Sequence, residues 1–103
     1  MRKLYLISAC VFFLINQLMS QSLTKNSRID LMLVRGDYEK VIDTCRLILS
    51  SDSLNPDIYY KLGTAYQNTL DEEQSLNCFY KAAWLRPENK VYNFSLAKAY
   101  YAL

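Results

Sequence analysis

The side chains that most often carry out catalysis or bind metal ions are sparse in this 103-residue chain. Histidine, the commonest general base and metal ligand, is absent. The acidic run Asp71-Glu72-Glu73 lies at the start of a predicted helix, where the helix dipole favours negative charge. The only two glycines, Gly36 and Gly63, are too few for a glycine-rich phosphate loop. We therefore expect no enzyme activity, no metal site and no cofactor.

Cysteines and one tripeptide are the remaining reactive features. Cys45 and Cys78 could pair in an oxidising compartment. Both also fall on helix faces, where a cysteine serves as a small apolar residue, and the sequence does not decide whether they pair. The tripeptide Asn93-Phe94-Ser95 matches a glycosylation acceptor, but it lies inside a predicted helix and such short matches arise by chance.

The charge distribution indicates no nucleic-acid partner. The formal net charge is +2, and Arg2 and Lys3 account for it, because the other ten Lys and Arg residues equal the ten Asp and Glu residues. A neutral chain with interspersed charges lacks the basic patch that binds nucleic acid or an anionic membrane.

The N-terminus is typical of a secretory signal peptide. A positive start is followed by a mostly apolar stretch over residues 4–15 and then by polar and small residues. A membrane helix needs roughly 20 apolar residues, so the stretch is short for one. We expect residues 1–20 to be a signal peptide cleaved after Ser20, with Ser22 as the other candidate. The rest would be exported to the periplasm or cell envelope without membrane insertion.

Two alternatives for the N-terminus stay open. One is an uncleaved signal anchor. The other is lipidation, because Ile7-Ser8-Ala9-Cys10 resembles a bacterial lipoprotein box, which would make the chain a lipoprotein attached through Cys10. Against it, the apolar stretch continues over residues 11–15, so that cleavage would fall inside the stretch.

From residue 26 onward the spacing of apolar residues predicts an all-α protein. Apolar side chains recur at intervals of three and four, as in an amphipathic helix. Gly36-Asp37, Asn55-Pro56 and Pro87 mark helix ends, and Asp71 with Gln74 reads as a capping box. We predict helices over about residues 26–35, 38–50, 56–68, 72–85 and 90–102. Their short links favour antiparallel hairpins.

The chain matches itself without gaps when residues 37–69 are laid over residues 71–103. Asp37 then falls on Asp71, and both begin predicted helices. Elsewhere apolar residues fall on apolar ones and the small Gly63 falls on the small Ala97, through the pairs Ile42 and Leu76, Cys45 and Phe79, Ile48 and Ala82, Leu62 and Leu96, Gly63 and Ala97, and Tyr66 and Tyr100. The sequence therefore predicts a helical repeat.

This period of about 34 residues resembles the tetratricopeptide repeat, whose signature is an aromatic residue, Leu-Gly, Tyr, then Ala, Phe and Pro at fixed spacing. The residues that match it are Tyr59, Leu62, Gly63, Tyr66, Ser75, Phe79, Ala82 and Pro87 in residues 56–89, and Leu96, Ala97 and Tyr100 in residues 90–103. Residues 22–55 fit as a degenerate first unit, because Lys25 and Arg28 replace the expected Tyr and Leu. The resemblance implies a right-handed α-solenoid of about 2.5 repeats.

The resemblance assigns the signature residues to packing. Gly63 and Ala97 would lie where the two helices of a unit cross closely. We therefore expect Gly63→Leu to cost more than its gain in helix propensity, since overpacking costs roughly 1–3 kcal/mol.

The resemblance also implies a concave face that binds a protein or peptide partner. Its residues would be Asp57, Tyr60, Thr64, Gln67 and Asn68 in the middle unit, Val91, Phe94, Lys98 and Tyr101 in the last, and Asn26, Asp30 and Leu33 in the first. Tyr60, Phe94 and Tyr101 would form an aromatic strip with a polar rim, which suits partner recognition. The alternative is packing against a further repeat or a sister chain.

The apolar end Ala99–Leu103 allows three interpretations, because repeat arrays usually end in a polar cap. In the first, the last helix is a rough cap. In the second, it is the contact through which the chain forms a homo-oligomer. In the third, the chain is the truncated N-terminal part of a longer repeat protein. Two functions follow. One is an exported scaffold for protein interactions. The alternative is part of an envelope sensor or assembly factor with no independent activity.

Overall fold

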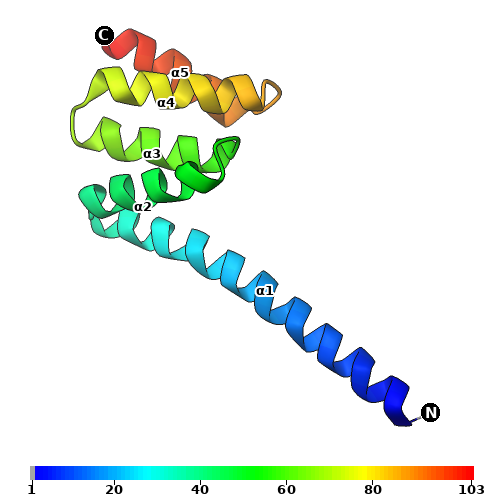
Figure 1. Ribbon diagram of the computed structural model, residues 1–103. Coiled ribbons are helices and arrows are strands. Elements are labelled where there is room, and N and C mark those ends of the chain that lie inside the picture. The colour runs from blue at the N-terminus through cyan, green and yellow to red at the C-terminus, as the bar shows by residue number, and fades with distance from the viewer. Residues whose placement is uncertain (1) are drawn as a thin grey trace. The chain divides into compact units, whose positions relative to one another are not determined.

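The computed structural model describes the backbone of residues 2–103 and the side chains of residues 7–17 and 26–103. Over these residues the chain is all-α, as predicted, and contains no strand (Figure 1). Its helices are α1 (Arg2–Arg35), α2 (Tyr38–Ser51), α3 (Pro56–Asn68), α4 (Glu72–Leu85) and α5 (Lys90–Ala102). The bounds of α2 to α5 agree with the predicted ranges, except that α2 ends one residue later.

Helix α1 is far longer than predicted. We expected a helix over residues 26–35 after a separate signal segment, but α1 begins at Arg2. The sequence before Gly36 contains neither glycine nor proline, so nothing interrupts the helix. The predicted cleavage points after Ser20 and Ser22 fall among residues 18–25, whose side chains lie outside the described residues. The signal peptide stays a prediction.

The chain divides into two compact units, Met1–Leu31 and Met32–Leu103. In the first unit the apolar side chains at positions 7 and 11–15 are exposed. Among the described residues, no helix combines the length and apolarity that a membrane span requires.

In the second unit each helix packs against the next one along the chain, α2 on α3, α3 on α4 and α4 on α5 (Figure 1). Local signals fix where these helices begin. The side chains of Asn55 and Asp71 accept hydrogen bonds from the first turns of α3 and α4, both at 3.3 Å, as predicted. Asn89 does the same for α5 at 3.0 Å. Asp37 stands at the N-cap position of α2, as the predicted helix start implies, but its side chain makes no such bond.

Two helix ends use a left-handed residue. Gly36 ends α1 with φ 80°, and the amide of Asp37 donates to the carbonyl of Met32 at 2.9 Å. Leu70 ends α3 in the same way with φ 62°, and the amide of Asp71 donates to the carbonyl of Tyr66 at 2.9 Å. A leucine in this conformation is strained, because its Cβ crowds the backbone.

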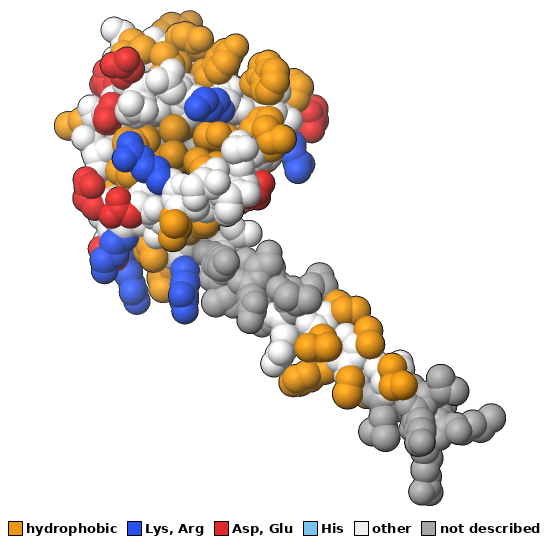
Figure 2. All heavy atoms as spheres, viewed as in Figure 1, with side chains coloured by type: hydrophobic (Ala, Val, Ile, Leu, Met, Phe, Trp, Pro, Cys, Tyr) orange, Lys and Arg blue, Asp and Glu red, His pale blue; other side chains and the backbone are white. Residues whose placement is uncertain are grey.

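The core of the second unit lies between these helices. Its fully buried side chains include Phe79, Ile58, Val41 and Cys45. A Cβ atom placed on Gly63 would lie 2.8 Å from two carbons of the Phe79 ring. The predicted close crossing at Gly63 is therefore confirmed. Figure 2 shows apolar side chains gathered over α4 and α5 on the face that it draws.

Candidate functional site

Helices α3 and α5 position most of the residues that the sequence assigned to partner binding. We call this set the α3–α5 face: Asp57, Tyr60, Thr64, Gln67, Asn68, Phe94, Lys98 and Tyr101. The two helices are linked near their starts, where the rings of Tyr60 and Tyr92 have centroids 5.2 Å apart. Near their ends, Gln67 of α3 and Ala99 and Ala102 of α5 line one cavity.

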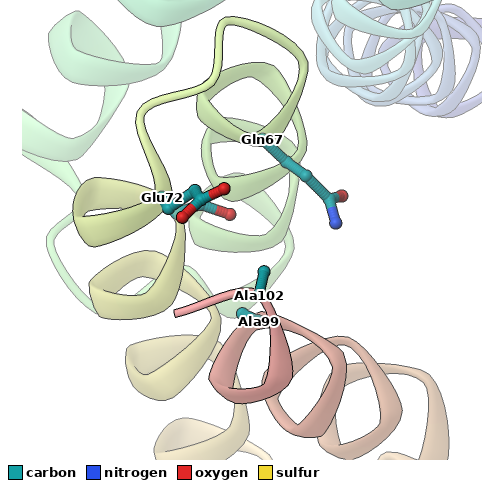
Figure 3. A pocket seen from close by; sticks show the side chains of 5 residues that line it. Gln67, Glu72, Ala99 and Ala102 are labelled. Carbon is teal, nitrogen blue, oxygen red and sulfur yellow. The ribbon is translucent and has the colours of Figure 1, made fainter.

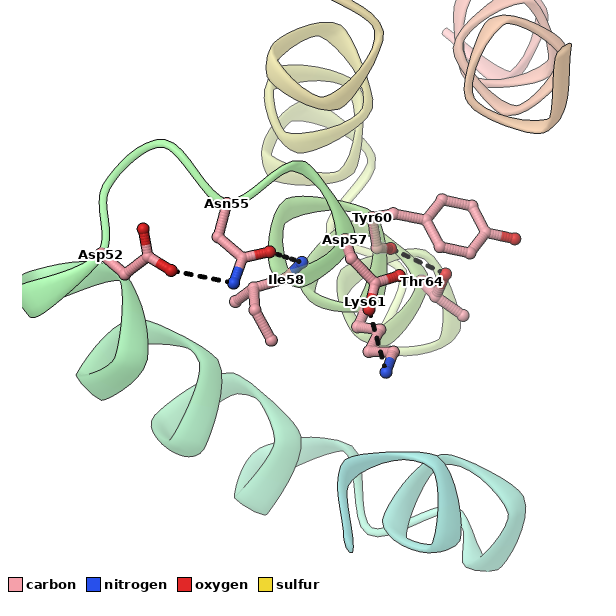
Figure 4. Close-up of polar contacts among 7 residues, drawn as sticks. All are labelled: Asp52, Asn55, Asp57, Ile58, Tyr60, Lys61 and Thr64. Carbon is pink, nitrogen blue, oxygen red and sulfur yellow. Dashed lines mark hydrogen bonds and ion pairs between the residues drawn. The ribbon is translucent and has the colours of Figure 1, made fainter. Parts of the chain in front are cut away.

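The first turns of α3 hold an ion pair (Figure 4). The ammonium of Lys61 lies 3.2 Å from a carboxylate oxygen of Asp57, one helical turn away. Lys61 is not among the predicted site residues, because a lysine in a helix is usually solvent-exposed, yet this one is only 8% exposed. Asp57 also acts on Tyr92: burial raises the pKa of Tyr92, and the Asp57 carboxylate adds to the rise. The negative charge of the pair thus lies within electrostatic reach of α5.

Further along α3, two polar side chains bond to their own helix. The Thr64 hydroxyl donates to the Tyr60 carbonyl at 2.9 Å, as Figure 4 shows, and the Asn68 amide donates to the Thr64 carbonyl at 2.8 Å. Asn68 keeps its side-chain oxygen as an acceptor. Gln67 and Asn68 are exposed, whereas Thr64 is half-buried. Polar groups for a partner are therefore concentrated at the C-terminal end of α3.

Tyr60 has a packing role that the sequence did not predict. We expected its neighbour Tyr59 to serve the core and Tyr60 to point elsewhere. Both are half-buried and pack against the cluster of Ala82, Ala83 and Tyr92. The Tyr60 ring also lies 5.8 Å from that of Phe79, between centroids. Tyr60 therefore joins α3 to both α4 and α5.

The two other aromatic residues of the predicted strip are open to solvent. Phe94 is 67% exposed and Tyr101 is 93% exposed. Lys98, which lies between them in sequence, is exposed, as is Val91. The exposed aromatic surface of this face thus belongs to α5.

The residues assigned to the first repeat fall in both compact units. Asn26 and Asp30 are exposed and belong to the compact unit Met1–Leu31, whereas Leu33 is half-buried and belongs to the second unit.

The cavity between the ends of α3 and α5 is small. It has a volume of about 20 Å³ and is lined by Gln67, Glu72, Ser75, Ala99 and Ala102 (Figure 3). That is room for about one water molecule. Any recognition by the α3–α5 face would therefore take place on its open surface rather than inside a pocket.

The signature residues divide between buried and exposed positions. Those buried or packed in the core are Tyr59, Leu62, Gly63, Tyr66, Ser75, Phe79, Ala82 and Leu96. Ser75 donates a hydrogen bond to the Gly63 carbonyl at 3.0 Å. Pro87, Ala97 and Tyr100 are not buried. Ala97 is exposed, and the described residues contain no helix after α5 for it to cross, so the close crossing there stays a prediction.

The cysteines of the second unit are free thiols. Cys45 and Cys78 are both buried and unpaired. Burial raises the pKa of Cys45 to about 12 and that of Cys78 to about 11. A thiol that stays protonated is a poor nucleophile and metal ligand. Within the described residues, no group of acidic residues and cysteines could hold a metal ion.

Comparisons with known proteins add no identification. No protein-family model matches the chain, and a search of curated protein sequences finds no match.

Proposed function

We propose that this chain is an exported helical-repeat scaffold, similar to tetratricopeptide-repeat proteins, that binds a protein or peptide on the α3–α5 face. One observation supports the repeat. Helix α2 begins at Tyr38 and α4 at Glu72, and the two helices end at Ser51 and Leu85. The number of residues between the two starts therefore equals the number between the two ends. The same offset relates α3 to α5 at both ends. Two copies of one helix pair thus follow each other at about 34 residues, the period of that family. Export rests on the charged start and the short apolar stretch.

The exposed aromatic residues of α5 support the binding role. Tyr101 is 93% exposed, and the exposed side chains of Lys98 and Gln67 belong to the same face. Tyrosine is enriched among residues that dominate binding energy, because it supplies a large apolar ring with a polar tip at low entropic cost. A polar rim around it supplies orientation. This combination favours a short peptide segment held on an open surface.

A peptide selection tests the proposal. Short random peptides would be selected on the full chain, and bound sequences would be measured by fluorescence anisotropy against Tyr101→Ala and Lys98→Ala variants. We expect Tyr101→Ala to weaken binding by about 30-fold, the usual loss at a dominant interface residue. Trp84→Ala is the matched control, because Trp84 is an exposed aromatic residue on α4, outside the α3–α5 face. Selected peptides that bind the Tyr101→Ala variant undiminished would contradict the proposal.

A second candidate function is self-association through α5. Tyr100 is exposed and Ala97 is not buried, whereas their counterparts one repeat earlier, Tyr66 and Gly63, are buried. A second copy could cover this surface. Sedimentation of the full chain over a range of concentrations tests it. We expect a dimer that Ala97→Glu disrupts and that the control Lys90→Glu, on the same helix, leaves intact. A monomer at all concentrations removes this candidate.

A further inference from the structure

A groove that no part of the proposed function uses lies between α2 and α4. Its volume is about 610 Å³, and its floor includes Tyr59 and Tyr66 of α3. It shares no residue with the α3–α5 face. Its chemistry is set by two cations, Arg46 on α2 and Lys81 on α4.

Each cation is held against a tyrosine ring. The Arg46 guanidinium donates a hydrogen bond to the Tyr66 hydroxyl at 2.5 Å and lies 5.8 Å from the ring centroid. The Lys81 ammonium lies 5.3 Å from the centroid of Tyr59. Such contacts orient a cation without neutralising it. Among the described residues, no carboxylate forms a salt bridge with either one, so both cations keep further N–H donors for a ligand.

The two positive charges both act on the thiol of Cys78. Cys78 lines the floor of the groove, and burial raises the pKa of that thiol to about 11. Lys81 and Arg46 both oppose the rise, because a nearby positive charge favours the thiolate. Because both cations line one groove, an acidic segment lying in it would be attracted by both.

Uncharged polar side chains extend the groove beyond the cations. Gln74 and Asn77 of α4 and Ser50 of α2 line it, and all three are exposed. The Ser50 hydroxyl donates to the Leu47 carbonyl at 2.5 Å and so offers its oxygen as an acceptor. The two amides each offer donors and an acceptor. This set suits the alternating N–H and C=O groups of an extended peptide backbone.

We propose that the groove between α2 and α4 binds an acidic peptide segment, with Asp or Glu carboxylates facing Arg46 and Lys81. The Arg46 guanidinium binds a carboxylate with two parallel hydrogen bonds, and the Lys81 ammonium donates to an acidic group of the same segment. Gln74 and Asn77 bond to the backbone of the segment. A free small anion would occupy only a small part of the volume and would leave these amides without a ligand, which is why the occupant is a peptide.

Binding of matched peptide pools to the full chain tests the proposal. One pool carries Glu at two neighbouring positions, with the other positions randomised, and the second pool carries Gln there. Fluorescence anisotropy at low salt should show tighter binding of the Glu pool, and added salt should weaken it. Arg46→Gln and Lys81→Gln should each weaken binding by about threefold, and together by about tenfold, as expected for partly exposed charge pairs.

Controls separate this site from general charge attraction. Lys90→Gln removes the same charge outside the groove and should leave binding unchanged. Arg46→Lys keeps the charge but loses the paired hydrogen bonds, so it should weaken binding less than Arg46→Gln. If Arg46→Gln alters the melting curve, its binding loss could reflect unfolding, and the Lys81→Gln variant then tests the proposal. The Lys81 ammonium packs on a ring face, so its removal should disturb the fold less.

Three results would overturn the proposal. The first is equal binding of the two pools. The second is an equal loss from Lys90→Gln. The third is displacement of the Glu pool by free glutarate or inorganic phosphate at the same concentration, which would assign the groove to small anions. None of them bears on the α3–α5 face, which is tested by Tyr101→Ala.

Discussion

Replacing Gly63 with alanine adds one methyl group at the point where α3 crosses α4. The new Cβ would lie 2.8 Å from Cδ1 and Cε1 of Phe79 and 3.2 Å from Cβ of Cys78. Non-bonded carbons prefer about 3.5–4.0 Å. The Phe79 ring is 1% exposed and packs against Tyr60, so it has little room to withdraw. The helices must separate, or the ring must leave its preferred rotamer.

Two opposing terms set the magnitude. Alanine stabilises a helix interior by about 0.8–1.0 kcal/mol relative to glycine. Overpacking a well-packed core costs about 1–3 kcal/mol. We expect a net loss of about 1 kcal/mol, which lowers the melting temperature of a domain of this size by roughly 4–8 °C. Gly63→Leu should cost more, because its larger side chain meets the same ring.

Urea denaturation of the full chain, followed by circular dichroism, measures both terms. The matched control is Ala97→Gly, at the equivalent but less buried position of α5, where only the propensity difference of about 1 kcal/mol should appear. In a Phe79→Leu background, Gly63→Ala should become neutral or stabilising, because the clash is relieved. If Gly63→Ala in the otherwise unchanged chain instead increased stability by the full gain in helix propensity, this expectation would be refuted.

Three further predictions concern stability. Leu70, with φ 62° and 83% exposed, is strained, so Leu70→Gly should raise the free energy of unfolding by about 0.5–1 kcal/mol in urea denaturation. Tyr60→Ala should destabilise by about 2–4 kcal/mol through lost packing, whereas Tyr101→Ala should change stability by less than about 0.5 kcal/mol, which parallel thermal melts would check. In the folded chain the buried thiols of Cys45 and Cys78 have pKa values of about 12 and about 11. In the unfolded chain a thiol ionises near ~8.5, so between these values only the unfolded state loses the proton. Under reducing conditions stability should therefore fall as pH rises above ~8.5, by up to about 1.4 kcal/mol per pH unit for each thiol, and the slope should be smaller in Cys45→Ala.

The bounds of α2 to α5 could be predicted because local signals set them. Asn55 and Asp71 accept hydrogen bonds from the first turns of their helices, and these bonds involve residues three positions apart in sequence. Gly36 supplies the left-handed residue that ends α1. Such interactions need no knowledge of distant contacts, so residue types and spacing suffice to place them.

The extent of α1 could not be predicted in the same way. A boundary near residue 20 was inferred from the pattern of a cleavable segment, which concerns processing and does not itself break a helix. Asn16, Gln17 and Ser20 are polar, but each is tolerated inside a helix at modest cost. Without Gly or Pro, α1 continues through them.

Contacts between helices could not be predicted from the sequence either. Arg46 and Tyr66 are far apart in the chain, and nothing in either residue type indicates that the guanidinium meets this hydroxyl. The packing of Tyr60 between Phe79 and Tyr92 depends equally on how three helices stack. Periodicity assigned each side chain to a face of its helix, but the neighbour on that face follows only from the tertiary fold.

Comparing equivalent positions of the two helix pairs separates packing residues from surface residues. Phe94 is exposed, but its equivalent Tyr60 is half-buried between α4 and α5, so the exposure of Phe94 follows from the lack of a covering helix in the described residues. Tyr101 differs, because its equivalent Gln67 is exposed although α3 is packed between neighbours. Covering α5 with another helix would therefore bury Phe94 and leave Tyr101 open. Among the aromatic residues of the α3–α5 face, Tyr101 is thus the one that such a helix would leave exposed, which favours Tyr101 as the residue that contacts the proposed partner.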